Sequence, residues 1–373
     1  MDDDIPYLLL TPGPLTTSRS VKAVMLRDFC TWDDDYNSLV SDIRRRLVQL
    51  AAQSPADFTA ILMQGSGTFS VEATLGSVVP ADGRVLVVNN GAYGERMAKI
   101  CRRLKIDCVE IHQAEEEPAD VGRIEHHLTH DRITHAALVH CETTTGILNP
   151  VAEVGQLAKR FGVTYIVDAM SSLGGIPLTM ESLNADYLIS SSNKCIQGVP
   201  GFGFVIARRC EFAATEGRAR SLSLDLFDQW REMETKHGKW RYTSPTHVVR
   251  AFAQALDELD QEGGVAARHQ RYTQNQRTLA RGLGELGFQP LVAEEFQSPI
   301  ITAFLFPDDE RFNFPDLYQS LKKRRFVIYP GKVSRAETFR VGTIGHVFPS
   351  DIRELVAAFG ETLAELHWSL HAG

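Results

Sequence analysis

A lysine follows closely on a short apolar stretch in the segment that runs from Asp186 to Cys195. The segment begins with Tyr-Leu-Ile after the aspartate, continues in small hydroxyl residues and reaches Lys194. If the apolar stretch is a buried strand, desolvation at its end lowers the pKa of the ammonium and frees the lone pair with which an amine forms an imine. Lys194 is therefore a candidate nucleophile, although a lysine that merely ends a strand is the ordinary alternative.

A second candidate is Asp168, which follows the apolar residues 165–167 and is predicted to emerge at a strand end. A lone aspartate in such a place is often only a helix cap. Together with a lysine 26 residues later, it supplies the two groups that a pyridoxal phosphate site needs, an acid that holds the proton on the ring nitrogen and an imine-forming lysine. The pair predicts proton transfer between a substrate carbon and the cofactor, which is a transamination step.

A glycine turn, residues 64–68, separates an expected strand from an expected helix. Backbone N–H groups and the helix dipole converge at such a turn, and Ser66 and Thr68 add hydroxyl donors, so the turn suits a phosphate. It lacks the lysine of a Walker motif and the third glycine of the dinucleotide fingerprint, which disfavours nucleotide hydrolysis and a Rossmann cofactor. A plain tight turn stays open as the alternative reading.

The elements that must position these groups alternate between strand and helix. Such alternation predicts a parallel sheet with helices on its faces. The expected strands cover residues 58–63, 85–89, 108–112, 136–140, 164–167, 187–190 and 202–207. The expected helices cover about 35–52, 69–79, a stretch after residue 94, 121–128 and 151–161.

Ligands of parallel sheets bind beyond the carboxyl ends of the strands. Each notable polar group follows the end of an expected strand, and these groups are Ser66, Tyr93, Thr143, Asp168 and Lys194. We therefore expect them to face one crevice, and this convergence is the strongest inference that the residues allow.

The remaining parts of the chain predict an arm, a linker and a smaller domain. Residues 11–14, Thr-Pro-Gly-Pro, cannot continue a helix, so residues 1–20 are expected to form an arm. A large cofactor-binding domain is expected over 21–258, with a polar linker near 218–246 that is exposed or at an interface. After helices at 249–259 and 265–286, a small α+β domain over 259–373 is expected, with strands near 300–306, 326–329 and 338–341 and helices near 315–324 and 352–366.

Composition excludes several classes of function. The chain has 373 residues, 43% of them hydrophobic and 23% charged, with a net charge of -8, so nothing attracts it generally to nucleic acid or anionic lipid. Its acidic start and the lack of a long apolar run give no sign of a secretion signal or a membrane span. The six cysteines show no metal-ligand spacing, so we expect reduced thiols, no metal and a cytoplasmic location.

Seven segments, in order over nearly the whole chain, carry a resemblance to a known family: residues 11–14, 65–68, 91–94, 142–146, 167–169, 192–194 and 339–342. In these segments the chain resembles the fold-type I pyridoxal phosphate enzymes, and among them the class V branch of alanine-glyoxylate and serine-pyruvate aminotransferases. Three longer segments, 30–36, 192–201 and 238–246, are similar to those of transaminases that use 2-aminoethylphosphonate and pyruvate.

The resemblance implies an α/β fold: a large domain with a mostly parallel seven-stranded sheet covered by helices, and a small α+β C-terminal domain. It implies pyridoxal 5'-phosphate as cofactor. It also implies transamination of 2-aminoethylphosphonate with pyruvate, giving phosphonoacetaldehyde and alanine in phosphonate degradation.

The resemblance further implies roles for single residues. Ser66, Gly67 and Thr68 are expected to hold the cofactor phosphate, Tyr93 to lie against its ring and Thr143 to bond near its hydroxyl. The remaining residues that the resemblance assigns to the cofactor are Asp168, Met170, Asn193, Lys194, Lys239, Trp240 and Thr243.

Two of these assignments reach beyond a single cofactor pocket. Lys239, Trp240 and Thr243 correspond to a family segment that reaches the neighbouring subunit's phosphate, which implies a homodimer with shared active sites. Arg340 matches the family's carboxylate-binding arginine, whose planar fork suits a carboxylate or a phosphonate. A surface salt bridge is its alternative role.

The N-terminal arm is expected to add substrate donors. Thr31 and Trp32 are the candidates that the resemblance implies, and Arg27 is a further one.

Three other functions are alternatives. An alanine-glyoxylate or serine-pyruvate aminotransferase would keep every cofactor contact and differ only in the substrate pocket. A cysteine desulfurase needs a nucleophilic cysteine late in the chain, and none follows Cys210. A catalytically silent binding protein on the same scaffold would be expected to lack Lys194 or Asp168, and both are present.

Overall fold

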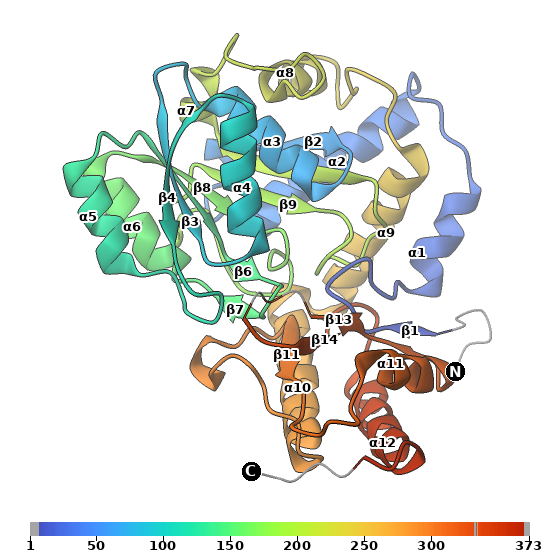
Figure 1. Ribbon diagram of the computed structural model, residues 1–373. Helices are drawn as coiled ribbons and strands as arrows, with labels where there is room; N and C mark the ends of the chain where they lie inside the picture. The colour runs from blue at the N-terminus through green and yellow to red at the C-terminus, as the bar shows by residue number, and fades with distance from the viewer. Residues whose placement is uncertain (1–6, 332, 334, 369–373) are drawn as a thin grey trace.

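The computed structural model describes residues 7–331, 333 and 335–368, and Figure 1 shows their arrangement. Residues 1–6 of the expected arm, and residues 332, 334 and 369–373 of the expected small domain, lie outside the described residues. At the centre of the larger part is a seven-stranded sheet in the order β2-β10-β9-β8-β5-β3-β4. Its strands are β2 (Phe58–Gln64), β3 (Arg84–Asn89), β4 (Asp107–His112), β5 (His135–Val139), β8 (Thr164–Asp168), β9 (Tyr187–Ser191) and β10 (Phe202–Arg208).

The sheet is mostly parallel, as the alternation of elements predicted. The neighbours β4, β3, β5, β8 and β9 pair in parallel. The prediction of parallel pairing was wrong for β10, which runs antiparallel to both β9 and β2. The reason is local: residues 192–201 join β9 to β10 without a crossover helix, and a short connection can join only antiparallel neighbours.

Helices cover both faces of the sheet because successive residues of a strand point to opposite sides. In β3, Leu86 and Val88 belong to one buried cluster and Val85 and Val87 to the other. The first cluster is closed by α2 (Asp34–Ala51), α5 (Val121–His130), α6 (Val151–Phe161) and α9 (Thr246–Glu262), and the second by α3 (Gly67–Val78), α4 (Ala92–Arg103) and α7 (Arg209–Ala213).

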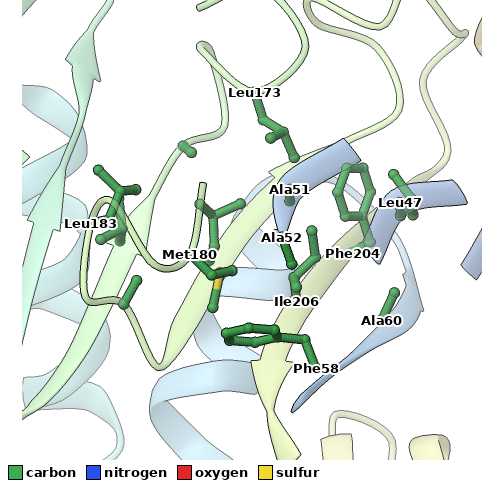
Figure 2. Close-up of a cluster of buried hydrophobic side chains, with 14 of the residues drawn as sticks. Leu47, Ala51, Ala52, Phe58, Ala60, Leu173, Met180, Leu183, Phe204 and Ile206 are labelled. Atoms are coloured by element: carbon green, nitrogen blue, oxygen red, sulfur yellow. The ribbon is translucent and has the colours of Figure 1, made fainter. Parts of the chain in front are cut away.

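Figure 2 shows the first cluster where α2 lies against β2 and β10. Leu47 of α2 lies in the same buried group as Phe58 and Phe204 of the two strands. Most apolar positions of α2 recur at helical spacing and are buried, which is how a helix with a charged outer face is held to a sheet.

The segment 218–246 is not simply a linker. It contains the helix α8 (Leu226–Thr235), which lies beside the edge strand β2 and contributes Phe227 to one core cluster and Met233 to the other. The prediction missed this helix because its many charged residues conceal an apolar spacing of three to four positions at 226, 230 and 233.

The smaller part packs around α10 (Gly264–Glu285), α11 (Phe314–Lys323) and α12 (Pro349–Glu365). An antiparallel sheet in the order β11-β14-β13 is formed by Ile301–Leu305, Thr338–Gly342 and Tyr329–Pro330. The strand expected at 326–329 is split, because β12 (Phe326–Val327) pairs with β1 (Leu8–Leu9) whereas β13 pairs with β14. The arm therefore adds a strand to the small part before it reaches α1 (Arg19–Ala23), which contacts α9.

The short hairpin β6 (Cys141–Glu142) and β7 (Ile147–Leu148) stands at the carboxyl end of β5. It lies between the two parts of the chain in Figure 1. Within the described ranges, no helix combines the length and the apolar character that crossing a membrane requires.

Candidate active site

A cavity of about 180 Å³ opens at the carboxyl ends of β2, β3, β8 and β9. A larger hollow of about 1000 Å³ lies along α10, but none of the strand-end residues lines it, so we place the site at the sheet. Most of the residues proposed from the sequence for the cofactor line the smaller cavity: Ser66, Gly67, Thr68, Tyr93, Asp168, Met170, Asn193 and Lys194. Val71, Arg96 and Ser191 also line it, and the sequence reasoning had missed them.

Lys194 lies in the loop that joins β9 to β10, and its Nζ donates to the carbonyl oxygen of Pro12 at 2.8 Å. Burial lowers the pKa of Lys194 to about 8, while the negative charge of Asp168 opposes this shift and the positive charge of Arg340 adds to it. The arm approaches closely here, since a Cβ on Gly13 would lie 2.9 Å from Lys194 Cδ. A substantial fraction of Lys194 is therefore a neutral amine near neutral pH.

Asp168 ends β8 and is 4% exposed. Its Oδ1 accepts a bond from the backbone N–H of Met170 at 2.8 Å. Burial raises the pKa of Asp168 to about 6, although the Met170 N–H, Lys194 and Arg96 favour the charged form. A buried carboxylate with one hydrogen bond from the backbone is stabilised further by a cationic N–H partner in the cavity.

The turn after β2 forms a cradle at the start of α3. Ser66 is the N-cap residue of this helix, yet its side chain makes no capping bond, so its hydroxyl is available to the cavity it lines. A Cβ on Gly67 would lie 2.2 Å from Met170 Sδ, so the glycine lets the Met170 side chain lie against the start of α3. N–H groups and hydroxyls that converge at a helix start fit an anionic group such as a phosphate.

Tyr93 is fixed by the hairpin after β5. Thr143 Oγ1 donates to Tyr93 Oη at 3.0 Å. The carboxylate of Glu142 accepts from the backbone N–H of Tyr93 at 3.1 Å and of Gly94 at 2.8 Å, so it caps α4. A Cβ on Gly91 would lie 2.5 Å from Glu142 Oε2, which explains the glycine at this position.

Glu142 is fully buried beside the cavity, and the sequence reasoning gave it no role. Burial raises the pKa of Glu142 to about 7, and bonds from the two backbone N–H groups at the start of α4 oppose the shift. Its charge therefore changes close to neutral pH.

Arg96 stands one turn after Tyr93 on α4. Its guanidinium lies 4.9 Å from the centre of the Tyr93 ring, and its Nη1 donates to Thr68 Oγ1 at 3.0 Å. It thus places a cation beside both the cradle and the ring. The spacing of three residues from Tyr93 on one helix face was the signal that could have found it.

Arg340 reaches the site through Thr143 rather than by lining the cavity. It is 3% exposed on β14, and it donates from Nη1 to the Thr143 carbonyl at 2.8 Å and from Nε to the Pro330 carbonyl at 3.0 Å. Burial lowers the pKa of Arg340 from its usual high value. A surface salt bridge does not describe this residue, because two backbone carbonyls hold it in the interior.

Other residues proposed from the sequence do not line the cavity in a single chain, and they are Thr31, Trp32, Lys239, Trp240 and Thr243. The Nζ of Lys239 lies 4.5 Å from the centre of the Trp32 ring. The Trp240 ring is 5% exposed and packs edge-on against Phe202 at 6.1 Å, inside its own subunit. Arg27 instead forms an exposed ion pair with Asp35.

The family is decided by comparison with known proteins. The model of the family "Aminotransferase class-V" matches residues 21–332. The chain belongs to the class-V aminotransferases. The 2-aminoethylphosphonate--pyruvate transaminase of Syntrophobacter fumaroxidans is 62% identical over 354 residues, 95% of each chain. The enzyme of that name from Klebsiella pneumoniae is 60% identical over 96% of this chain and 98% of its own.

A solved structure shares the fold of this class-V aminotransferase. The pyridoxamine-pyruvate aminotransferase from Mesorhizobium loti superimposes with a TM-score of 0.90 at 22% identity, over 100% of this chain and 96% of its own. The class-V enzyme described here uses pyridoxal phosphate.

The residues present fit pyridoxal phosphate by three independent observations. The cradle at Ser66 suits the phosphate, and Asp168 suits a protonated ring nitrogen. Ser191 Oγ is buried in the cavity wall without a hydrogen-bond partner among the described residues, so the cavity offers a polar atom that a ligand can satisfy.

Proposed function

We propose that this aminotransferase transfers the amino group of 2-aminoethylphosphonate to pyruvate, giving phosphonoacetaldehyde and alanine, in the degradation of phosphonates. The observation that carries the proposal is the 62% identity over 95% of the chain with a transaminase of that name. The geometry supports it, because Lys194 has a lowered pKa and feels the charges of both the buried Asp168 and the buried Arg340.

In this proposal Lys194 moves the proton. Bound pyridoxal phosphate supplies an aldehyde and an electron-withdrawing ring that make a hydrogen on the adjacent substrate carbon acidic. The neutral amine of Lys194 accepts that proton from the substrate carbon and returns it to the former aldehyde carbon of the cofactor, and its pKa of about 8 suits both transfers near neutral pH. Asp168 remains an anion and holds a proton on the ring nitrogen by a charge-assisted bond.

The other cavity residues hold and orient the cofactor in this proposal. Ser66, Gly67 and Thr68 bind the phosphate with hydroxyls and N–H groups at the start of α3. Tyr93 lies against the ring and Thr143 bonds near its hydroxyl. Met170 and Asn193 border the same cavity, next to Asp168 and Lys194 respectively.

Arg340 is the proposed anion receptor for both substrates. A guanidinium pairs with two oxygens of either a phosphonate or a carboxylate, so one cation can serve both halves of the reaction. Its burial strengthens such a pair, because competing water is excluded. Thr31 and Trp32 are proposed as further donors from the region of the arm.

We also propose a homodimer whose subunits share their active sites. Large apolar side chains are exposed on one chain, among them Trp32 at 77%, Leu222 at 77% and Tyr242 at 51%. Phe69 and Tyr242 line one hollow, and Phe69 directly follows the phosphate cradle. A second copy that covers these side chains would bring its own residues, Lys239 and Thr243 among them, to the edge of the cavity.

A division into domains and a location complete the proposal. We propose an arm over 1–20, a large domain over 21–258 with its dimer-forming segment near 218–246, and a small domain over 259–373. A cytoplasmic location is supported by the six cysteines, which are all free thiols.

A half-reaction with single amines tests the substrate. The purified enzyme, loaded with pyridoxal phosphate, is mixed with 2-aminoethylphosphonate, alanine or serine, and the loss of the cofactor's visible absorbance is followed. We expect rapid loss with 2-aminoethylphosphonate, and slow reversal of that loss by glyoxylate compared with pyruvate. Conversion by alanine or serine but not by 2-aminoethylphosphonate would support the alternative, an alanine-glyoxylate or serine-pyruvate aminotransferase.

A further inference from the structure

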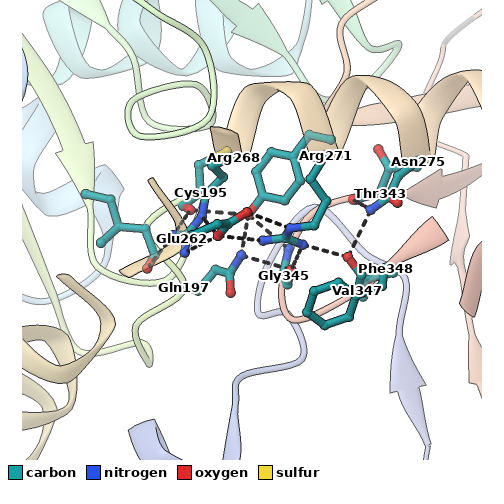
Figure 3. A network of polar contacts seen from close by, with 12 residues as sticks. Cys195, Gln197, Glu262, Arg268, Arg271, Asn275, Thr343, Gly345, Val347 and Phe348 are labelled. Atoms are coloured by element: carbon teal, nitrogen blue, oxygen red, sulfur yellow. Dashed lines mark hydrogen bonds and ion pairs between the residues drawn. The ribbon is translucent and has the colours of Figure 1, made fainter. Parts of the chain in front are cut away.

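A polar network lies where the two parts of the chain meet, outside the cavity (Figure 3). Its centre is Glu262 at the end of α9. The carboxylate bonds to Arg268 Nη2 and Nε, each at 2.8 Å, and to Arg271 Nε at 2.7 Å and Nη2 at 3.1 Å. In the described chain, no other carboxylate pairs with either guanidinium, so a single negative charge is shared between two cations.

One set of bonds in this network holds the loop that carries Lys194. Arg268 Nη1 donates to the carbonyl oxygens of Cys195 at 3.0 Å and Ile196 at 3.3 Å. Tyr272 Oη donates to the Cys195 carbonyl at 3.2 Å. Cys195 directly follows Lys194, so these bonds set the backbone on which the lysine stands.

A second set of bonds holds the loop that follows β14, the strand of Arg340. Arg271 Nη1 donates to the carbonyl oxygens of Gly345 at 2.9 Å and Val347 at 2.6 Å. Asn275 Nδ2 donates to those of Thr343 at 3.1 Å and Val347 at 3.0 Å. Because this loop continues β14, these bonds set where the strand of Arg340 ends.

One side chain spans the two loops directly. Gln197 Nε2 donates to Tyr272 Oη at 2.6 Å and to the Gly345 carbonyl at 2.9 Å. Gln197 has a backbone φ of 70°, a conformation that residues other than glycine rarely adopt. The surrounding bonds therefore hold the loop in a conformation that it would not favour by itself.

Burial makes Glu262 indispensable to this network. Arg268 is 1% exposed, and a buried cation is costly without a negative charge beside it. Burial opposes the ionisation of Glu262, yet bonds from Arg271 and Arg268 hold the pKa of Glu262 below its usual value. Loss of the carboxylate would leave two guanidinium groups to separate or to recruit water.

We infer that Glu262 is a positioning residue, which through Arg268 and Arg271 fixes the loop of Lys194 against the loop that follows Arg340. The network thus sets the separation between the group that moves the proton and the group that binds the substrate anion. The catalytic part of this inference rests on the proposed function, whereas the mechanical coupling of the two loops does not. A substrate held at one end and attacked at the other is sensitive to that separation.

The test compares Glu262→Gln with Asp260→Asn in the enzyme loaded with pyridoxal phosphate. Asp260 lies on the same helix and pairs with Arg46, away from both loops. Hydrogen exchange of residues 195–197 and 343–347 is measured by mass spectrometry, and kcat and KM are measured for 2-aminoethylphosphonate and pyruvate.

For Glu262→Gln we expect faster exchange in both loops at once, a higher KM for both substrates and a loss of about ten- to a hundredfold in kcat/KM. A partly unfolded enzyme would lower kcat without raising KM, so KM separates positioning from mere instability. Asp260→Asn should change neither loop. Unchanged exchange in both loops, or faster exchange in only one of them, would overturn the inference.

Arg271→Lys decides the matter if Glu262→Gln does not fold. Lysine keeps the charge beside Glu262 but cannot also reach two carbonyls. We expect residues 343–347 to exchange faster while residues 195–197, still held by Arg268, keep their protection, and unchanged exchange at 343–347 would contradict the role of Arg271. If the wild type does not act on 2-aminoethylphosphonate, the proposed function fails, but the exchange data still decide the coupling.

Discussion

At the scale of single residues, one environment shifts two functional groups toward neutral pH. Burial lowers the pKa of Lys194 to about 8 and raises that of Asp168 to about 6, because it disfavours the charged form of each. Each charge also favours the other, which keeps both shifts moderate. At physiological pH Asp168 is then mostly an anion, as the proposed function requires, and a pKa of about 8 lets Lys194 both accept and release a proton.

The pKa of Lys194 predicts how cofactor uptake depends on pH. The protein without cofactor should take up pyridoxal phosphate faster as pH rises, with a midpoint near 8, because only the neutral amine attacks an aldehyde. Stopped-flow absorbance against pH measures this. A midpoint at or above 10 would mean that burial does not act on Lys194 as described, and Lys194→Ala should show no covalent uptake at any pH.

At the scale of elements, a two-stranded hairpin organises a helix of the site. Glu142 on β6 caps α4 and thereby places Tyr93 and Arg96, which are one turn apart. The same hairpin presents Thr143, which bonds to both Tyr93 and Arg340. This hairpin therefore links α4, which packs on the large sheet, to β14 of the small part.

The burial of Glu142 predicts a pH-dependent difference in stability between Glu142→Gln and the wild type. The pKa of Glu142 is raised from 4.5 to about 7, so its protonated form stabilises the folded wild type below pH 4.5, and this stabilisation is lost as pH rises through 7. The variant lacks this loss. The difference in the free energy of unfolding, Glu142→Gln minus wild type, should therefore rise by about 3 kcal/mol between pH 4.5 and pH 8.

Denaturant unfolding of both proteins across this pH range measures the difference. Titrating groups that do not interact with Glu142 occur in both proteins and cancel. A difference that does not change with pH would show that Glu142 titrates normally.

At the scale of the whole molecule, the cavity gathers only part of the proposed site. Lys239 lies over Trp32 and does not line the cavity of its own chain. A second copy is the proposed source of the missing contacts, and it would also cover the exposed apolar side chains near β2 and α3.

Mixed subunits test this sharing. Lys194→Ala and Lys239→Ala should each be inactive or nearly so alone, but a random mixture should recover about a quarter of the wild-type activity, since half the dimers are hybrids with one intact site. Activity of co-expressed, separately tagged subunits measures this. Lys236→Ala, on the exposed end of α8, is the matched control and should be active alone. No recovery in the mixture would place Lys239 at the site of its own chain.

Much of the fold and of the cavity could be read from local sequence. The apolar runs before Asp168 and Lys194 and the glycine turn at Ser66 depend mainly on neighbours in the chain, and the alternation of strands and helices predicts that their ends meet. Most of the residues named from these features line the cavity. The helix α8 was missed because its apolar residues lie among charged ones.

The sequence alone predicted the chemistry: an aspartate and a lysine at the ends of adjacent strands, and a turn suited to an anion. Only the tertiary structure decided how these groups are held. Three features join residues far apart in the chain: the antiparallel direction of β10, the cap that Glu142 forms on α4, and the ion pairs of Glu262 with the two arginines that bond to distant loops. Such contacts depend on register and on the packing of whole elements, so no local spacing reveals them.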